Sequence, residues 1–324
     1  MPHLSRGSLG QRVARAYGAL MDPNGRNRRK RGRPVHGWVV LDKPLGLGST
    51  KAVAVVRRLL DAQKAGHAGT LDPLATGVLP VALGEATKTV PFLMDAPKGY
   101  DFTVRWGEHR ETLDAEGDVV ATSEARPERA DIEAVLPRFV GEIEQVPPKY
   151  SAIKIDGKRA YDLARSGADV AMKTRVVRID ALSLTDCDDG SASFHVDCGK
   201  GTYVRSLARD IADALGTLGY VSFLRRTRVG PFTLVQSFGV DALEAMDYGA
   251  RASEALLSLS TALDDIPVLA VGETDAALLK QGRAIAAPPN SPQDTLVLIE
   301  CGGVAVALSQ PRDGRFHPKR VFNI

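Results

Sequence analysis

The 324-residue sequence has few cysteines and no long apolar run. Its three cysteines are widely spaced and include no Cys-x-x-Cys pair, so neither a disulfide framework nor a zinc site is indicated. No stretch reaches the roughly 18 apolar residues that a membrane-spanning helix needs. These absences favour a cytoplasmic protein with no membrane partner.

Several catalytic motifs are also missing. No Gly-x-x-x-x-Gly-Lys-Ser/Thr segment occurs, which argues against a phosphate-binding loop. The six histidines are scattered, and no two stand three or four residues apart, so we expect no metal site. A Ser/His/Asp triad stays open on composition, although no Gly-x-Ser-x-Gly motif supports one.

Charge is unevenly distributed along the chain. Residues 1–36 carry nine Lys or Arg and one acid, a net +8, whereas the rest carries 33 basic and 38 acidic residues, a net −5. We expect residues 1–35 to form a disordered basic arm. Such an arm is typical of proteins that bind a polyanion, because Lys and Arg contacts to phosphates release counterions. A solvated leader without a partner and an organelle transit peptide stay open as alternatives.

The hydrophobic pattern predicts an α+β fold with a mixed, largely antiparallel sheet. Strands are expected at 37–42, 78–83, 100–106, 176–184, 192–198 and 220–229, and helices at 51–62 and 202–215. From Ile266 onward the sequence changes to short Val-rich runs separated by glycines and prolines. This change predicts a small separate β module at the C-terminus.

The segment from Gly66 to Gly77 is the best candidate for a functional site. It places Asp72 and His67 among glycines and small side chains, where the backbone can approach another molecule closely. Asp72 is therefore a candidate nucleophile or base. Asp72-Pro73 also has the pattern of a helix N-cap followed by a first-turn proline. A carboxylate in a closed site stays ionised most readily beside a guanidinium, and Arg205 is the candidate partner.

Five segments together resemble the bacterial TruB family of tRNA pseudouridine synthases. They are Gly37–Pro44 (GWVVLDKP), Gly66–Leu79 (GHAGTLDPLATGVL), Gly84–Lys88 (GEATK), Gly199–Arg205 (GKGTYVR) and Tyr220–Arg226 (YVSFLRR). The resemblance covers roughly residues 36–324 and implies the pseudouridine-synthase fold. It also implies isomerisation of the uridine at position 55 in the tRNA T-loop, with no cofactor and no obligate protein partner. The substrate that the resemblance implies is the T-arm of tRNA.

The resemblance also implies roles for individual residues. Asp72 corresponds to the catalytic aspartate, Arg205 to the arginine paired with it, and Tyr203 to the tyrosine that accepts the C5 proton. His67 would occupy space that the flipped uridine leaves, and Tyr100 would stack on the flipped uracil. The remaining substrate-binding positions are Lys43, beneath the site, and Leu224, an apolar wall.

The charge distribution and the resemblance together predict three parts of the chain. They are the arm at 1–35, a catalytic domain at 36–250, and a linker with an RNA-binding module resembling a PUA domain at 251–324. Candidate RNA contacts are Arg225, Arg226, Arg228, Lys319 and Arg320. These basic residues and the arm would also suit a non-catalytic RNA chaperone, which stays open as an alternative, and folding tRNA is a secondary possibility for the enzyme itself.

Three positions, in two segments, depart from the family pattern. The usual Thr-Asp-Thr-x-Asp segment reads Arg110-Glu111-Thr112-Leu113-Asp114 here, so we expect the longer Glu111 to take over a substrate contact. Gly48 stands where serine is common, which should loosen the turn before the first helix.

Overall fold

The structure is a computed structural model that describes residues 32–151, 153–155, 157–166, 171–289, 291 and 294–324. Residues 33–324 form one compact unit. The predicted basic arm lies outside the described residues, except for its last four positions.

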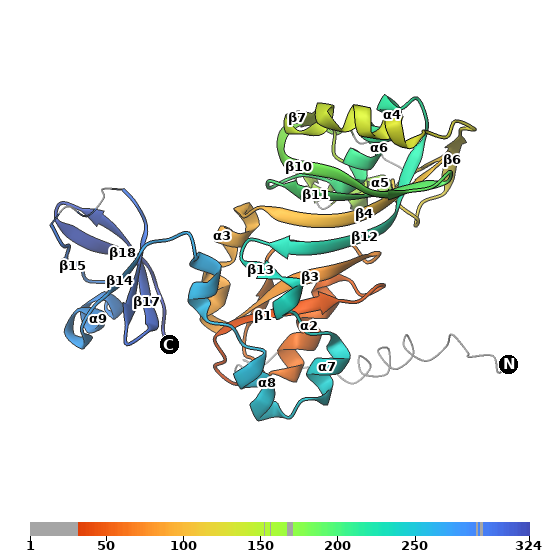
Figure 1. Cartoon of the computed structure of the whole chain (residues 1–324). Coiled ribbons are helices and arrows are strands. Elements are labelled where there is room, and N and C mark those ends of the chain that lie inside the picture. Colours follow the sequence, from red (N-terminus) through yellow and green to blue (C-terminus); the bar gives the residue numbers. More distant parts are fainter. Residues whose placement is uncertain (1–31, 152, 156, 167–170, 290, 292–293) are drawn as a thin grey trace. The chain divides into compact units, whose positions relative to one another are not determined.

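One nine-stranded sheet organises most of this unit (Figure 1). Its main path runs β1 (Gly37–Lys43), β3 (Ala75–Leu83), β12 (Gly219–Val229), β4 (Lys98–Trp106), β11 (Ser191–Cys198), β10 (Arg175–Cys187) and β7 (Gly141–Gln145). β2 (Ala65–His67) pairs with β3, and β13 (Phe232–Thr233) pairs with β12. The β3–β12 pair is parallel and the other pairs in this sheet are antiparallel. The predicted mixed, largely antiparallel sheet is confirmed.

Two long amphipathic helices pack on this sheet because their apolar residues recur at helical spacing. α6 (Val204–Ala214) buries Val204, Leu207, Ala208 and Ile211 in a core shared with β4 and β11. α2 (Ser49–Leu59) buries Ala52 and Val56 against β1 and β3. Figure 1 shows α6 beside β11 and α2 beside β1 and β3. The two helices leave the β3–β12 junction between them, and the candidate site lies there.

Shorter elements complete the fold. The helices are α3 (Val90–Asp95), α4 (Arg129–Val135), α5 (Ala160–Arg165), α7 (Val240–Ala245), α8 (Tyr248–Glu254) and α9 (Glu273–Lys280), with 3-10 turns η1 (Gly84–Lys88), η2 (Leu136–Phe139), η3 (Leu234–Gln236) and η4 (Leu259–Leu263). Two small hairpins pair β5 (Glu108–Arg110) with β6 (Val119–Thr122) and β8 (Lys154–Ile155) with β9 (Lys158–Arg159).

The predicted C-terminal β module is present as a second sheet. Its strands follow the order β14 (Val268–Ala270), β16 (Val297–Cys301), β17 (Val304–Arg312), β18 (Arg315–Val321) and β15 (Ile285–Ala286). The expected boundary at residue 250 falls inside α8. Leu257 exchanges two backbone hydrogen bonds with Trp38 of β1, of 2.7 and 2.9 Å. The chain therefore continues to pack on the first sheet beyond the expected boundary, and the second sheet begins at β14.

Gly48 is the residue before α2, and it has no side chain to cap the helix. Its backbone is extended (φ −70°, ψ 146°), and a Cβ built there meets no atom within 4 Å. We therefore expect Gly48→Ser to raise the free energy of unfolding by about 0.5 kcal/mol, because the hydroxyl can accept a hydrogen bond from the first helical turn. Urea titration monitored by circular dichroism measures this change. Gly48→Ala is the control, and equal stabilities of the two variants would contradict the capping account.

Candidate active site

The loop that carries Asp72 is tied to its neighbours on the N-terminal side of α2. The Ser49 hydroxyl donates to the Leu71 carbonyl and accepts from the Leu71 N–H, each at 2.8 Å. The Pro73 carbonyl accepts from the Gly46 N–H at 2.8 Å. These contacts fix the backbone on both sides of Asp72.

Asp72 itself begins a tight turn rather than a helix. The Ala75 N–H donates to the Asp72 carbonyl at 3.0 Å, and the chain enters β3 at Ala75. The N-cap interpretation of Asp72-Pro73 is therefore wrong. A proline suits a tight turn as well as a first helical position, so the dipeptide alone does not separate the two structures.

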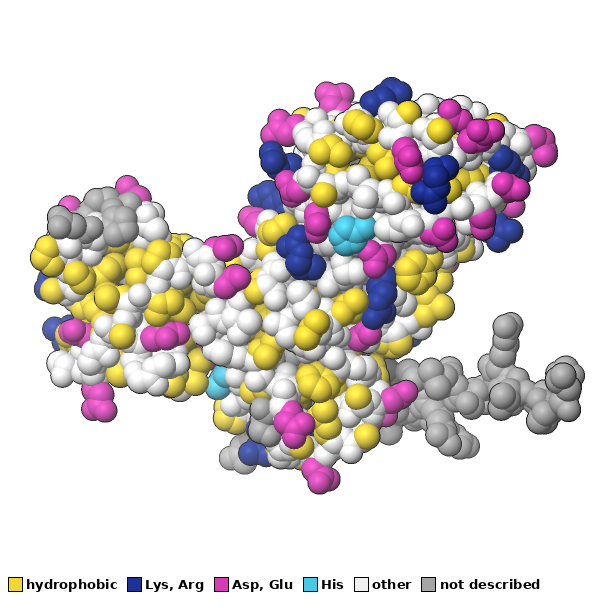
Figure 2. Space-filling model, viewed as in Figure 1, with side chains coloured by type: hydrophobic (Ala, Val, Ile, Leu, Met, Phe, Trp, Pro, Cys, Tyr) yellow, Lys and Arg dark blue, Asp and Glu magenta, His cyan; other side chains and the backbone are white. Residues whose placement is uncertain are grey.

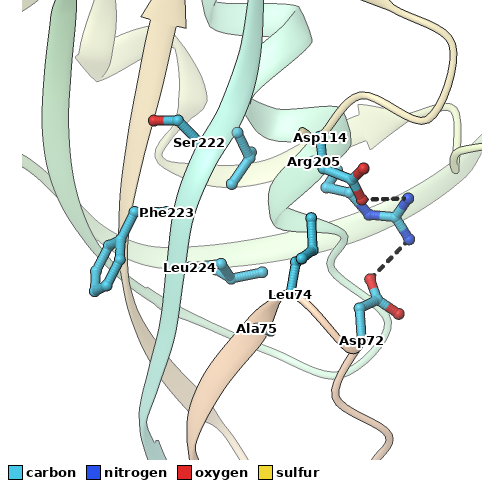
Figure 3. Close-up of a pocket in the computed structure, with 9 residues that line it drawn as sticks. Asp72, Leu74, Ala75, Asp114, Arg205, Ser222, Phe223 and Leu224 are labelled. Atoms are coloured by element: carbon cyan, nitrogen blue, oxygen red, sulfur yellow. Dashed lines mark ion pairs between the residues drawn. The ribbon is translucent and has the colours of Figure 1, made fainter. Parts of the chain in front are cut away.

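The Asp72 carboxylate forms an ion pair with Arg205, as the sequence predicted (Figure 3). Arg205 Nη2 lies 2.8 Å from Asp72 Oδ2, and Arg205 Nη1 lies 3.3 Å from Asp114 Oδ2. The Arg205 side chain is 7% exposed and that of Asp114 is 10% exposed, whereas the Asp72 side chain is 43% exposed. A buried guanidinium thus holds a carboxylate that an incoming molecule can reach.

The Arg205 guanidinium is also held by backbone carbonyls, one of them in the segment Arg110–Asp114 that departs from the family pattern. Its Nη1 donates to the Thr112 carbonyl at 2.8 Å, and its Nη2 donates to the Tyr150 carbonyl at 2.9 Å. The Thr112 hydroxyl donates to Asp114 Oδ1 at 2.5 Å. Four acceptors from three parts of the chain therefore fix the position of this guanidinium.

Asp114 was not among the site residues predicted from the sequence, although the segment that contains it was recognised as a departure from the family pattern. The signal was present, since Asp114 ends that segment and carries the carboxylate two residues after Thr112. Glu111, which was expected to take over a substrate contact, accepts a hydrogen bond from the Tyr150 hydroxyl at 2.7 Å. The longer side chain thus reaches the residue whose carbonyl binds Arg205.

An apolar wall faces Asp72 across a small pocket. Leu74, Ala75, Val221 and Leu224 line it together with Asp72, Asp114 and Arg205. Figure 3 shows Leu224 on the side of β12 that faces Leu74 and Asp72, while Phe223 points to the other side. Leu224 therefore forms part of an apolar wall of this pocket.

Two further predicted site residues, Lys43 and His67, are buried or partly buried close to the loop. Lys43 is 0% exposed and donates to the carbonyls of Leu47 at 2.7 Å and Pro73 at 3.4 Å. Burial lowers the pKa of Lys43 to about 8, although the charge of Asp72 opposes this shift. Burial also lowers the pKa of His67, and the charge of Arg226 lowers it further. We therefore expect a neutral His67 ring near pH 7.

The two tyrosines of the prediction have different surroundings. Tyr100 on β4 is partly buried, and burial raises the pKa of its phenol. Arg226 opposes that rise in the pKa of Tyr100 through its charge and a hydrogen bond, while the charge of Asp72 adds to it. Tyr203 precedes α6, and its ring lies under the Arg175 guanidinium at 4.8 Å.

The basic run Arg225–Arg228 on β12 does not form one continuous surface for RNA. Arg226 is 1% exposed, so its predicted role as an RNA contact is wrong. Arg225 pairs with Asp42 and Arg228 pairs with Asp197, each at 2.7 Å. Successive strand residues point to opposite faces, and the register of β12 also shifts between Arg226 and Arg228, so the sequence alone did not show which of these arginines would be covered.

The face in Figure 2 shows basic and acidic side chains interspersed rather than gathered by sign. Lys319 and Arg320 are both exposed on β18 of the C-terminal sheet. Within the described ranges, no group of three or more His, Cys, Asp or Glu side chains is placed to hold a metal ion. In the same part of the chain, no helix has the length and apolar character to cross a membrane.

Comparison with known proteins finds the same similarity along most of the chain. A family model of TruB family pseudouridylate synthase (N terminal domain) matches residues 57–204, and one of the tRNA pseudouridylate synthase B C-terminal domain matches residues 205–266. A tRNA pseudouridine synthase B of Caulobacter sp. (strain K31) is 55% identical over 307 residues, covering 92% of this chain and 99% of that protein. One from Bradyrhizobium diazoefficiens is 56% identical over 303 residues, covering 90% and 87%.

Two solved structures share the fold over nearly the whole chain. A chain from an H/ACA RNP bound to a substrate RNA containing 2'-deoxyuridine has a TM-score of 0.68 at 25% identity, covering 94% of this chain and 93% of that chain. A chain from a Cbf5-Nop10-Gar1 complex has a TM-score of 0.67 at 27% identity, covering 93% and 92%. The segment with the Asp72 loop and Arg110–Asp114 falls within the region matched by the first family model.

Proposed function

The chain belongs to the TruB family of pseudouridylate synthases, and from that membership we propose that it isomerises uridine to pseudouridine in tRNA, at the T-loop uridine of position 55. One observation carries the proposal. An accessible carboxylate, Asp72, is held by the buried Arg205 at the mouth of an apolar pocket. Site-resolved pseudouridine mapping of tRNA from cells lacking this protein tests it, and an unmodified T-loop uridine is the expected result.

The chemistry is an isomerisation in which nothing is added to the base. The bond between N1 of uracil and C1′ of ribose breaks, and its electron pair leaves with the base. Asp72 either attacks C1′ or assists formation of a glycal by taking a sugar proton. The uracil then turns and C5 bonds to C1′, as the Asp72 carboxylate leaves C1′ in the first route or as the sugar proton returns to C2′ in the glycal route. The C5 proton is then removed, and N1 receives a proton. Both routes require one ionised carboxylate beside the sugar.

The target nucleotide must leave its stack to reach Asp72, which costs a few kcal/mol. Flat rings recover part of this cost by stacking on bases. We assign this stacking to His67, which ends β2 at the start of the Asp72 loop, and to Tyr100 on β4. Lys43 holds the loop from beneath through the Pro73 carbonyl, and Leu224 bounds the space for the uracil.

The phenol that accepts the C5 proton can be identified by comparing two variants. Because burial raises the pKa of the Tyr100 phenol and so keeps it protonated, and because Tyr100→Phe retains the flat ring, we expect Tyr203→Phe to slow the reaction more. Loss of a general base lowers the rate by about 100-fold or more. Single-turnover pseudouridine formation measures both variants. A larger loss in Tyr100→Phe would instead assign the C5 proton to Tyr100 and contradict the role that the family resemblance gives to Tyr203.

The C-terminal sheet is proposed to bind RNA outside the T-loop. Its exposed Lys319 and Arg320 suit contacts to phosphates, which position RNA without reading its sequence. We include in this proposal that residues 251–324 comprise the linker and this module, and that the module is similar to a PUA domain.

A further inference from the structure

Arg226 lies inside the protein, directly behind the loop that carries Asp72. On β12 it stands between two neighbours, opposite Gly77 of β3 and opposite Tyr100 of β4. Its side chain is among the largest that are fully buried. The basic run therefore includes a guanidinium that RNA cannot reach and that has no role in the reaction steps described above.

The Arg226 guanidinium joins the two ends of the Asp72 loop. Its Nη2 donates to the Gly69 carbonyl at 3.0 Å, and its Nη1 donates to the Thr70 carbonyl at 3.4 Å. Its Nε donates to the Val78 carbonyl at 2.8 Å. Gly69 and Thr70 precede Asp72, and Val78 follows it on β3. One planar side chain thus fixes the distance between the entry and the exit of the loop.

Two glycines of the loop are explained by this close approach. Gly77 has φ +98°, and a Cβ there would lie 2.2 Å from the Arg226 carbonyl oxygen. Gly69 has φ +90°, and its Cβ would lie 3.3 Å from Arg226 Nη1. Side chains at these positions would push the loop away from β12. Two of the glycines in the segment Gly66–Gly77 are therefore explained by the close approach of Arg226.

The charge of Arg226 has an unusual setting for a buried cation. In the described part of the chain, its hydrogen-bond partners are carbonyl oxygens and the Tyr100 phenol rather than carboxylates. Burying an unpaired guanidinium costs several kcal/mol, and an apolar side chain of similar volume would avoid that cost. Arg offers five N–H donors in a fixed plane, which an apolar side chain or a lysine cannot replace.

We propose that Arg226 is a positioning residue for the reaction, which holds both ends of the loop so that the Asp72 carboxylate stays against Arg205 and meets the sugar in one orientation. The inference rests on the proposed function. It concerns the shape of the loop, however, so it can be measured with and without the reaction.

Two substitutions test the proposal. Arg226→Lys keeps a buried cation but replaces the planar fork by a single ammonium, and Arg226→Gln removes the charge. We expect both to speed amide hydrogen exchange in the peptide that spans residues 69–78 and to lower the single-turnover rate by about 100-fold, as a small misplacement of a catalytic group does. tRNA affinity should be unchanged. If Arg226→Gln does not fold, Arg226→Lys decides.

Arg251 provides a matched control away from the site. It also donates to three backbone carbonyls, those of Leu243, Glu244 and Leu59. Arg251→Lys should leave both the exchange of residues 69–78 and the rate unchanged. Wild-type exchange and a wild-type rate in Arg226→Lys would overturn the proposal, as would a lost rate with unchanged exchange. If the wild type forms no pseudouridine while Arg226→Lys still loosens the loop, the proposed function fails and the loop-holding role survives.

Discussion

Replacement of Asp72 by asparagine is expected to abolish pseudouridine formation while tRNA binding persists. The amide keeps the size of the side chain but supplies neither a nucleophile nor a base for the sugar. Loss of a group that acts covalently costs about 10⁴-fold or more in rate. The single-turnover rate, with enzyme in excess over T-loop substrate, measures this loss. Filter binding under the same conditions gives the affinity for tRNA.

Asp101→Asn is the matched control, since Asp101 lies on β4 next to Tyr100 but pairs with His195 at 2.6 Å. It should retain the wild-type rate. A single-turnover rate in Asp72→Asn comparable to that of the wild type would exclude the covalent role of Asp72. A wild-type protein that binds tRNA but forms no pseudouridine would instead support the RNA chaperone alternative. The two outcomes are distinct because binding and turnover are measured separately.

The fold was largely predictable because its elements carry regular hydrophobic patterns. α6 was recognised from Val204, Leu207 and Ile211, which the structure buries on one face. β4 was recognised from the alternation that begins at Tyr100. The order of the strands was not predictable from these patterns. Pairing of β3 with β12 joins residues far apart in sequence, and a strand pattern identifies neither its partner nor its direction.

The pairing of Asp72 with Arg205 was predictable because a carboxylate in a closed site stays ionised most readily beside a guanidinium, and because the family resemblance gives the two residues these roles. Asp72 and Arg205 were named from the loop and the helix, and the structure places them 2.8 Å apart. Arg225, Arg226 and Arg228 show the limit of that reasoning. They form one basic run in the sequence, yet the fold gives Arg226 to the interior and pairs the other two with carboxylates. Arg226 is buried because the Asp72 loop lies over it, and the basic run alone does not show which of its residues that loop covers.

The last large effect is expected from Arg205→Lys. Arg205 spans Asp72 and Asp114 and also binds two backbone carbonyls, which requires the planar fork of a guanidinium. A lysine ammonium can reach one carboxylate or the other but cannot hold all four acceptors in place. The Asp72 carboxylate should then rotate among several orientations, and the single-turnover rate should fall by about 100- to 1,000-fold.

Arg209→Lys is the control for this prediction, because Arg209 lies one turn further along α6 and pairs with Asp210 at 2.6 Å. Its rate should match the wild type, which separates the site from general effects on the helix. Asp114→Asn should reproduce part of the loss in Arg205→Lys, because it removes the second charge that holds the guanidinium. A wild-type rate in Arg205→Lys would show that charge alone suffices. In that case the fixed geometry between Asp72 and Asp114 has no part in catalysis.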